Sequence, residues 1–316
     1  MNAILCYDEW GGVVILSNLK SLNAFGESNF EPLCMIDDCA FNKDAVCSQG
    51  LYSLSEQCDK IRKVPNTKIP KIGQRVFYSK DFIELLSTSS SKGNQKKFVS
   101  KDRKYFVKMQ FNYQGRDWND DLVEVIASNL GIQFGFYCLK QHLGLMDSLD
   151  CSYSEFFEGK FIAYKRIDPM EQLFDYTNGI DQLKFAINCI ESKTTVDCSR
   201  YFYEMLLLDY LVCNEDRHLY NFGVLQTEDG IAVAPLFDFG LGLFEHDNEY
   251  FGKTVQETEK IALKKPFGNQ LPLIEWLEKE YNFKRPMKAD VNDFIFPSKL
   301  AEEWLHYSLT RLEIKV

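Results

Sequence analysis

Two stretches of the sequence, close together in the chain, decide the fold. The first is Asn214-Glu215-Asp216-Arg217-His218-Leu219-Tyr220-Asn221-Phe222-Gly223, and the second is Val233-Ala234-Pro235-Leu236-Phe237-Asp238-Phe239-Gly240. Asp216 and Asn221 have four residues between them, and the second stretch spells D-F-G from Asp238 to Gly240. Either pattern alone is common in turns and protein cores, but the two in this order, each with a strand-like approach, are much more specific.

This arrangement predicts phosphoryl-transfer chemistry. The spacing from Asp216 to Asn221 is that of the base and the metal-binding amide in a kinase catalytic loop, and D-F-G supplies a second metal ligand, Asp238. Phosphoryl transfer needs a carboxylate that orients the attacking hydroxyl, and oxygen ligands that hold Mg²⁺ against the phosphates of ATP. We therefore expect Asp216 to act as the catalytic base, and Asn221 and Asp238 to bind Mg²⁺.

The same chemistry requires a cation on the phosphates and an acid that holds it, and both have candidates upstream. Apolar and polar residues alternate over 104–111, which predicts a strand with Lys108 on the opposite face from its larger apolar neighbours. Helical spacing over 117–129, with acids in the first turn, predicts a helix that Gly131 ends. Glu124 on this helix is the expected partner of Lys108, and Asp120 and Asp121 compete with it for that role.

No G-x-G-x-x-G phosphate loop occurs in this upstream region. A Ser-rich stretch, 87–97, takes its place and offers backbone amides, hydroxyls and three lysines to a triphosphate. Its composition alone is equally typical of a solvated linker.

The order of elements predicts the architecture. Strand-like segments dominate 76–168, and helical spacing dominates the rest, most strongly over 201–212. Strands followed by helices predict an α+β fold in which a β-rich N-lobe is joined to a mainly helical C-lobe, with a ligand cleft between them. We expect a small N-terminal extension or accessory subdomain over 1–75, an N-lobe over 76–168 and a C-lobe over 169–316.

With these motifs the chain resembles a known family, the HipA-like serine/threonine kinases with their small stand-alone, CtkA-like members. The family's catalytic loop N-x-D-R-H-x-x-N-x-G matches 214–223, its P-[LI]-[FY]-D run matches 235–238, and its Ser-rich G-x-Q-x-K phosphate loop matches 93–97. The resemblance covers about 82–267. It implies a bilobal kinase that uses ATP and Mg²⁺ to phosphorylate Ser or Thr of proteins, and its own Ser-rich loop at Ser90 or a neighbour.

The resemblance also implies site residues. Lys108 is the phosphate lysine, Glu124 is the helix acid, and the hinge between the lobes maps to 164–167, where backbone groups contact adenine. The nucleotide-binding residues implied in this way are Ser90, Ser91, Gly93, Asn94, Gln95, Lys97, Lys108, Tyr164, Arg166 and Ile167. No A-P-E follows Asp238, so regulation by a eukaryotic-type activation segment is not expected.

Composition excludes other functions and bounds the partners. The chain has 316 residues, 45% of them hydrophobic, and a formal net charge of −10, as expected of a soluble globular protein that is an unlikely partner for nucleic acid. It lacks a run of about 20 apolar residues and a basic N-terminal region, so neither integral membrane association nor a signal peptide is expected. We expect a cytoplasmic bacterial protein, or one delivered to another cell without a classical signal, that acts on a protein substrate. An antitoxin or other regulatory protein is an open partner.

Two other functions stay open at this stage. Phosphoinositide kinases also carry D-R-H-x-x-N followed by D-F-G, but 241–250 holds three acids and neither Lys nor Arg, whereas an inositol phosphate headgroup needs cations. A pseudokinase that only binds is disfavoured because every required carboxylate, amide and lysine is present. His218 is an alternative to Asp216 as the base, although we expect Arg217 and His218 to brace the loop through hydrogen bonds.

Overall fold

The computed structural model describes residues 4–7, 13–16, 30–32, 46–48, 75–85, 95–110, 112–113, 116–147, 149–157, 159–244, 250, 252–261 and 267–316. The chain divides into two compact units, one of residues 1–78 and 144–150 and the other of residues 79–143 and 151–316. The predicted catalytic, metal-binding and nucleotide-binding residues that the structure describes belong to the second unit. The predicted division at 75 and 168 stays a prediction.

The first unit is made of short strands. β1 (Ile4–Tyr7) pairs antiparallel with β2 (Val13–Leu16), and β3 (Phe30–Pro32) pairs antiparallel with β4 (Val46–Ser48). β5 (Arg75–Phe77) runs parallel to the last three residues of β11 (Gln141–Met146).

The second unit begins with an antiparallel sheet. A 3-10 turn (Ser79–Asp81) leads into β6 (Phe82–Leu85), which pairs with β7 (Lys97–Ser100), and β7 pairs with β8 (Tyr105–Met109). β8 then pairs with β12 (Leu149–Glu155), so these strands have the order β12-β8-β7-β6. A two-residue pair, β9 (Asn112–Tyr113) and β10 (Arg116–Asp117), follows β8.

The alternation predicted over 104–111 is present in β8, although the strand is shorter. Lys108 lies opposite Lys97 of β7 and Ser152 of β12, and therefore on one face of the sheet. Val107, fully buried, belongs to the other face.

Helix α4 (Asp120–Gln133) follows the sheet and differs from the predicted helix at both ends. It begins at Asp120, after Asn119, whose backbone is left-handed (φ 48°). Asp117, the predicted first residue of the helix, belongs to β10 instead. Gly131 does not end the helix. A Cβ atom at this position would lie 2.9 Å from Cβ of Cys138, so the glycine allows close packing inside the helix.

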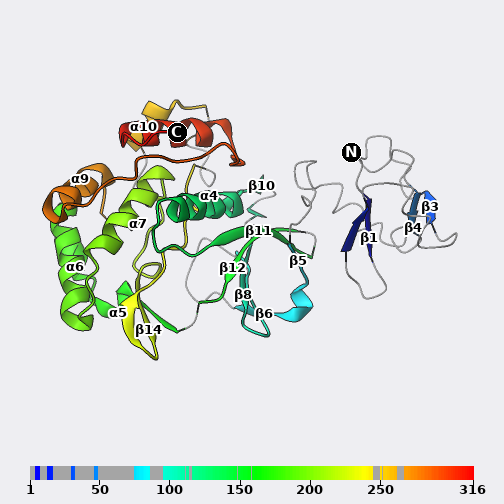
Figure 1. The fold of residues 1–316 in the computed structure, drawn as a ribbon, viewed down its shortest axis with the longest axis horizontal. Helices are drawn as coiled ribbons and strands as arrows, with labels where there is room; N and C mark the ends of the chain where they lie inside the picture. Colours follow the sequence, from blue (N-terminus) through cyan, green and yellow to red (C-terminus); the bar gives the residue numbers. More distant parts are fainter. Residues whose placement is uncertain are drawn as a thin grey trace. The chain divides into compact units, whose positions relative to one another are not determined.

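The remaining elements build a mainly helical lobe (Figure 1). They are β13 (Lys160–Ala163), α5 (Tyr164–Ile167), a 3-10 turn (Gln172–Asp175), α6 (Gly179–Thr194), α7 (Ser199–Leu211), β14 (Gly223–Thr227), β15 (Gly230–Val233), α8 (Val255–Ile261), α9 (Gln270–Tyr281) and α10 (Lys299–Arg311). The three strands form a small antiparallel sheet of order β13-β14-β15. The side chains of Asn178, Asn269 and Ser298 cap the N-termini of α6, α9 and α10.

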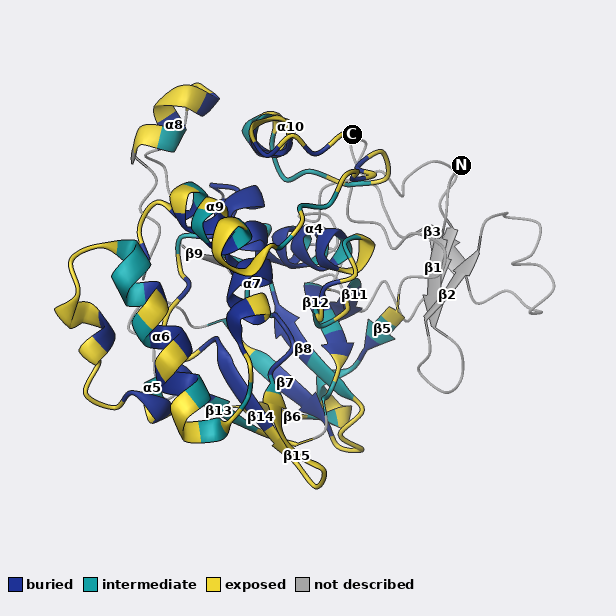
Figure 2. Ribbon diagram, turned by 60° about the vertical axis from the view of Figure 1, so that its left-hand side comes forward, coloured by how far each residue is buried: buried dark blue, intermediate teal, exposed yellow. Residues whose placement is uncertain are grey.

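Helix α7 is the centre of this lobe. All of its residues except Arg200 are buried, and it contacts α4, α9 and α10. Figure 2 shows α7 dark blue along most of its length, whereas α6 and α9 keep exposed outer faces. Trp304 of α10 donates an indole hydrogen bond to the carbonyl of Leu211 at 3.1 Å and so fixes the end of α7, where the Asn214–Gly223 segment begins.

The fold is therefore α+β, with a β-rich lobe followed by a mainly helical lobe, as the sequence predicted. In the part of the chain that the structure describes, no helix is both long enough and apolar enough to cross a bilayer.

Candidate active site

Lys108 occupies the centre of a set of charged groups from three elements. Its Nζ donates to Oε1 of Glu124 on α4 at 2.5 Å and also to Oδ1 of Asp238, in the segment after β15. The Lys108 side chain is almost completely buried, whereas the Asp238 side chain keeps 28% of its surface exposed. The cation is thus held inside the protein, while the side chain of Asp238 stays partly accessible to solvent.

Burial and neighbouring charges shift the pKa values of Lys108 and Asp238 in opposite directions. Burial lowers the pKa of Lys108, but the carboxylates of Asp238 and Glu124 raise it by more, and the net shift is upward. Burial raises the pKa of Asp238, but the cations of Lys108 and then Lys97 lower it by more, so it lies well below its ordinary range. Lys108 is therefore charged and Asp238 ionised at neutral pH, as metal and phosphate binding require.

Glu124, rather than Asp120 or Asp121, reaches the lysine. Its second oxygen accepts a hydrogen bond from the backbone N–H of Phe239 at 3.2 Å, so one buried carboxylate joins β8 to the D-F-G segment. Asp120 instead accepts from the side chain of Gln95. Asp121 accepts from the side chain of Gln110 at 3.2 Å.

Arg217 fixes the loop that carries the predicted base. Its guanidinium makes a two-pronged contact with the carboxylate of Asp209 on α7, at 2.9 Å from Nε and 2.7 Å from Nη2. Its Nη1 donates to the carbonyl oxygens of Asn221 at 3.2 Å and Phe237 at 2.8 Å. The guanidinium also lies over the ring of Phe239, 4.7 Å from its centroid. One buried side chain thus ties α7, the loop and the D-F-G segment together, the bracing role expected of it.

Asn221 and Asp238 are adjacent, as the metal-ligand prediction requires. The amide nitrogen of Asn221 lies 3.3 Å from Oδ2 of Asp238 and 3.1 Å from the carbonyl oxygen of Asp216. Mg²⁺ in nucleotide sites commonly takes one or two protein oxygens and fills its other positions with phosphate and water. Asp238 offers a carboxylate, and Asn221 offers an amide oxygen that also accepts from the backbone N–H of His218 at 3.1 Å, so these two residues could hold Mg²⁺.

Asp216 lies at the surface of the same loop. Its backbone N–H donates to Oδ1 of Asn214 at 3.2 Å, while its side chain is exposed. The preceding residue, Glu215, accepts a 2.5 Å hydrogen bond from the hydroxyl of Tyr250, which anchors the chain beyond D-F-G to the loop. The carboxylate of Asp216 is therefore presented to solvent on a loop that is held from both sides.

The Ser-rich stretch is only partly described. Ser90, Ser91, Gly93 and Asn94 lie outside the described residues. Gln95 donates to the carbonyl oxygen of Met109 at 3.0 Å and to Asp120, which joins the end of the stretch to β8 and α4. Lys97 lies beside Lys108 across two strands, and its charge acts on Asp238. Two cations therefore face the Asp238 carboxylate from the β-rich lobe.

The residues predicted as the hinge lie elsewhere. Tyr164 and Ile167 belong to helix α5 and are buried in the core of the helical lobe, and Arg166 is exposed. Their backbone groups are already engaged: Tyr164 N–H donates to the carbonyl oxygen of Phe222 at 2.8 Å, and the carbonyl oxygen of Ile167 accepts from Lys193. The two large side chains of this segment therefore pack into the core of the helical lobe, and its contact with adenine stays a prediction.

The chain crosses between the lobes earlier, between the end of β12 at Glu155 and the start of β13 at Lys160. Phe157 in this connection has its ring centroid 6.4 Å from that of Phe237, next to Asp238, and Phe161 lies 5.3 Å from the same ring. All three rings are partly exposed. This aromatic cluster of Phe157, Phe161 and Phe237 offers stacking surface beside the charged groups.

Sequence reasoning missed Asp209 and the aromatic cluster. Asp209 had a usable signal, because a carboxylate within the apolar run 201–212 has to be buried, and a buried carboxylate requires a cation. The aromatic cluster had no such signal in the sequence. Phe237 is 76 residues or more from Phe157 and Phe161, and the rings meet only in the folded protein.

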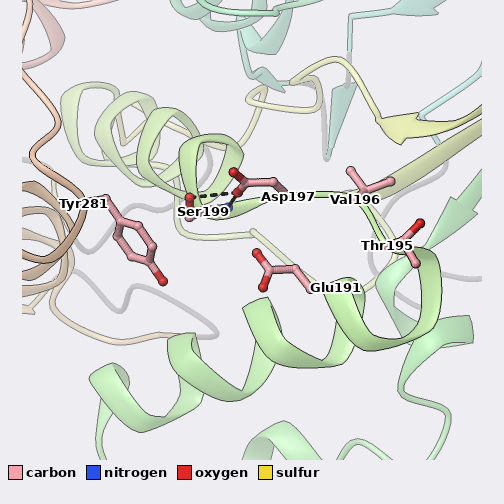
Figure 3. Close-up of a pocket in the computed structure, with 6 residues that line it drawn as sticks. All are labelled: Glu191, Thr195, Val196, Asp197, Ser199 and Tyr281. Atoms are coloured by element: carbon pink, nitrogen blue, oxygen red, sulfur yellow. Dashed lines mark hydrogen bonds between the residues drawn. The ribbon is translucent and has the colours of Figure 1, made fainter.

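A surface pocket of about 410 Å³ lies among the helices and contains none of the predicted site residues (Figure 3). It is lined by Glu191, Thr195, Val196, Asp197, Ser199 and Tyr281. Asp197 accepts from both the backbone N–H and the hydroxyl of Ser199, at 3.1 and 3.0 Å, so its carboxylate serves the start of α7. We assign no ligand to this pocket.

Comparison with known proteins supports the fold. No protein-family model matches the sequence, and no curated protein matches it. Among solved structures, the chain is similar to the Helicobacter pylori proinflammatory kinase CtkA, with a TM-score of 0.50 and 17% identity over 75% of this chain and 93% of that one. The chain shares the fold of this kinase. HipA of the Shewanella oneidensis toxin–antitoxin system, solved with HipB and operator DNA, matches 83% of this chain and 71% of its own at 11% identity and a TM-score of 0.37, too distant to support an argument.

Proposed function

We propose that this protein is an ATP- and Mg²⁺-dependent serine/threonine protein kinase. The observation that carries the proposal is the continuous set of contacts from Glu124 through Lys108 and Asp238 to Asn221, with Asp216 exposed on the same loop as Asn221. A phosphate-binding cation, a metal-binding carboxylate and amide, and a carboxylate base are the groups that phosphoryl transfer uses. In this chain they come from three separate segments, and Glu124 on α4 adds a fourth.

Each residue has a role that its surroundings permit. Lys108, held in place by Glu124, binds phosphate oxygens of ATP, and Asp238 and Asn221 hold Mg²⁺, which neutralises charge on the phosphates when bound. Asp216 accepts the proton of the substrate hydroxyl. The hydroxyl oxygen then forms the new bond to the γ-phosphorus, the bond to the bridging oxygen breaks, and ADP leaves with that electron pair.

The aromatic cluster supports a place for the base of the nucleotide. Phe157, Phe161 and Phe237 adjoin the phosphate-binding groups through Asp238, and partly exposed rings stack well with purines. This cluster replaces 164–167 as the proposed adenine contact. The substrate that we propose is a Ser or Thr of a protein, including the Ser-rich loop around Ser90, and an antitoxin or other regulatory protein stays a prediction.

The test is incubation of purified protein with γ-labelled ATP and Mg²⁺, alone and with a generic basic protein, followed by phosphosite mapping. We expect label on Ser or Thr that disappears in Asp216→Asn and Asp238→Asn. The first variant should retain more nucleotide affinity than the second, because only Asp238 holds metal on the phosphates. Asp175→Asn, an exposed carboxylate outside the site, is the matched control.

The other outcomes are decisive as well. Label on phosphoinositides in a parallel lipid assay, with none on protein, would establish a lipid kinase instead. Binding of ATP without transfer to either substrate would indicate a pseudokinase. Equal ATP affinity and turnover in both variants would refute the roles given to Asp216 and Asp238.

A further inference from the structure

Stacking on the aromatic cluster explains how a base is held, but not how one base is chosen over another. Every nucleobase has a flat face that an aromatic ring can cover, so stacking tolerates any base. Selection requires polar groups placed against the edge of the base. In the segment predicted to contact adenine, the backbone N–H of Tyr164 and the carbonyl oxygen of Ile167 are already bonded within the helical lobe. A polar side chain near the cluster that lacks a partner would supply the missing selection.

Ser154 has the right position for this task. In the antiparallel pairing of β12 with β8, Ser152 lies opposite Lys108 and Ser154 lies opposite Phe106. Because side chains two residues apart in a strand share a face, Ser154 lies on the face of the sheet that carries Lys108. Three residues after Ser154 the chain reaches Phe157 of the aromatic cluster. Ser154 is thus placed between the proposed phosphate lysine and the proposed stacking surface.

The hydroxyl of Ser154 is a buried polar group without a partner. The residue is 0% exposed, and its Oγ makes no hydrogen bond with any residue that the structure describes. The buried serine of α4 differs, because Oγ of Ser128 donates to the carbonyl oxygen of Leu139 at 3.0 Å and accepts from the backbone N–H of Gln141 at 2.9 Å. A buried hydroxyl that is left unpaired destabilises the folded protein, so its retention points to a ligand that completes it.

We propose that Oγ of Ser154 hydrogen-bonds the edge of adenine that carries the 6-amino group, and so selects the base of the nucleotide. This inference rests on the proposed ATP-dependent function. A hydroxyl can accept from the 6-amino group or donate to the ring nitrogen beside it. This edge lies opposite N9, to which the ribose and phosphates are attached, so it is the edge that enters the protein deepest.

Phe106 controls access to the hydroxyl. Ser154 has no accessible surface, so the base reaches it only when a neighbouring side chain moves. Phe106 lies directly opposite Ser154, where side chains of paired strands are in contact, and it is partly exposed. A change of side-chain rotamer on binding is common, and rotation of the Phe106 ring admits the base.

The experiment compares two nucleotides in calorimetric titrations with Mg²⁺: ATP, and purine riboside triphosphate, which lacks the 6-amino group. We expect Ser154→Ala to weaken ATP binding about 3- to 10-fold, the effect of one neutral hydrogen bond, with kcat within about twofold. The wild-type protein should prefer ATP over the analogue by a similar factor, and the variant should bind the two equally. Because the variant loses an unpaired hydroxyl, its midpoint of urea unfolding without nucleotide should stay level or rise.

Ser308→Ala is the matched control. Ser308 is also 0% exposed, on α10, but its Oγ has the carbonyl oxygens of Leu211 and Leu305 within 3.3 and 3.0 Å. We expect this variant to have a lower urea midpoint and an unchanged affinity for ATP, the reverse of the result for Ser154→Ala.

Several results would overturn the inference and leave the kinase function intact. They are an unchanged ATP affinity in Ser154→Ala, weaker binding that comes with a lower urea midpoint, and a preference for ATP over the analogue that persists in the variant or is absent from the wild type. Failure of the wild-type protein to bind ATP at all would refute the proposed function and this inference with it.

Discussion

Asp209→Asn tests whether one buried ion pair holds the catalytic loop in place. The substitution keeps the size of the side chain but removes the charge opposite Arg217. Both side chains are inaccessible to solvent, at 0% and 1% exposure, so water cannot replace the lost carboxylate. Burial lowers the pKa of Arg217, and the Asp209 carboxylate that raises it would be gone. Arg217 would still remain charged in the core, because the ordinary pKa of an arginine lies far above neutrality.

The expected cost follows from this burial. Removing one partner of a buried ion pair typically destabilises a protein by about 3–5 kcal/mol, because an uncompensated charge stays behind. For a folding unit of this size, 1 kcal/mol corresponds to about 2–4 °C in melting temperature, so we expect a fall of roughly 6–20 °C. Because Arg217 also binds the carbonyl oxygens of Asn221 and Phe237, the variant should lose phosphoryl transfer even below its new melting temperature.

An exposed pair on α10 supplies the control. Glu303→Gln removes a carboxylate from the Lys299–Glu303 pair, in which the two side chains are 86% and 48% exposed, and such pairs contribute less than about 1 kcal/mol. Both variants would be unfolded by urea and by heat, followed by circular dichroism. Equal losses in the two variants, or a loss below about 1 kcal/mol in Asp209→Asn, would refute the reasoning.

Three further predictions follow from single contacts. Gly131→Ala should destabilise the fold by about 1–3 kcal/mol in a urea titration, since its Cβ would lie 2.9 Å from Cβ of Cys138; an unchanged midpoint would contradict the close packing. Lys108→Met should abolish label transfer from ATP, whereas Lys104→Met, at an exposed position just before the same strand, should not, and equal activities would count against Lys108 as the phosphate lysine. Because the folded-state pKa of Asp238 is depressed, its ionised form stabilises the protein above about pH 4 and that stabilisation is lost as pH falls further; the stability difference between wild type and Asp238→Asn should therefore shrink from pH 7 to pH 3, and a constant difference would contradict the ion pair with Lys108.

Lys108 shows what a local sequence pattern can predict and what it cannot. Period-two alternation placed it on the face of a strand, which is a local property of the β backbone. The choice of Glu124 over Asp120 and Asp121 was left open, because all three lie in the first turns of one helix. It depends on how α4 packs against β8, and the contacts of Gln95 and Gln110 with the other two acids settle it.

The segment 164–167 was predicted as the hinge from the family resemblance, and its own residues give no independent sign of a hinge. Placing a hinge by resemblance requires a count of residues between motifs, and insertions shift that count without changing the fold. Tyr164 carried a warning, because a large aromatic residue beside Ile167 is as suited to a core as to a cleft. In the structure it stacks on Phe222, with ring centroids 5.0 Å apart.

The sequence by itself predicted the order of the lobes and named the side chains proposed for the chemistry. Asp216 and Asn221 lie on one loop, and Asp238 lies on one short segment after it. The spacing of these residues is therefore a local property that the sequence shows directly. The tertiary structure alone decided which distant groups meet: Asp209 with Arg217, Phe157 with Phe237, and Lys108 with both Glu124 and Asp238. Their partnership depends on packing between elements far apart in sequence, where burial removes water and makes each polar contact obligatory.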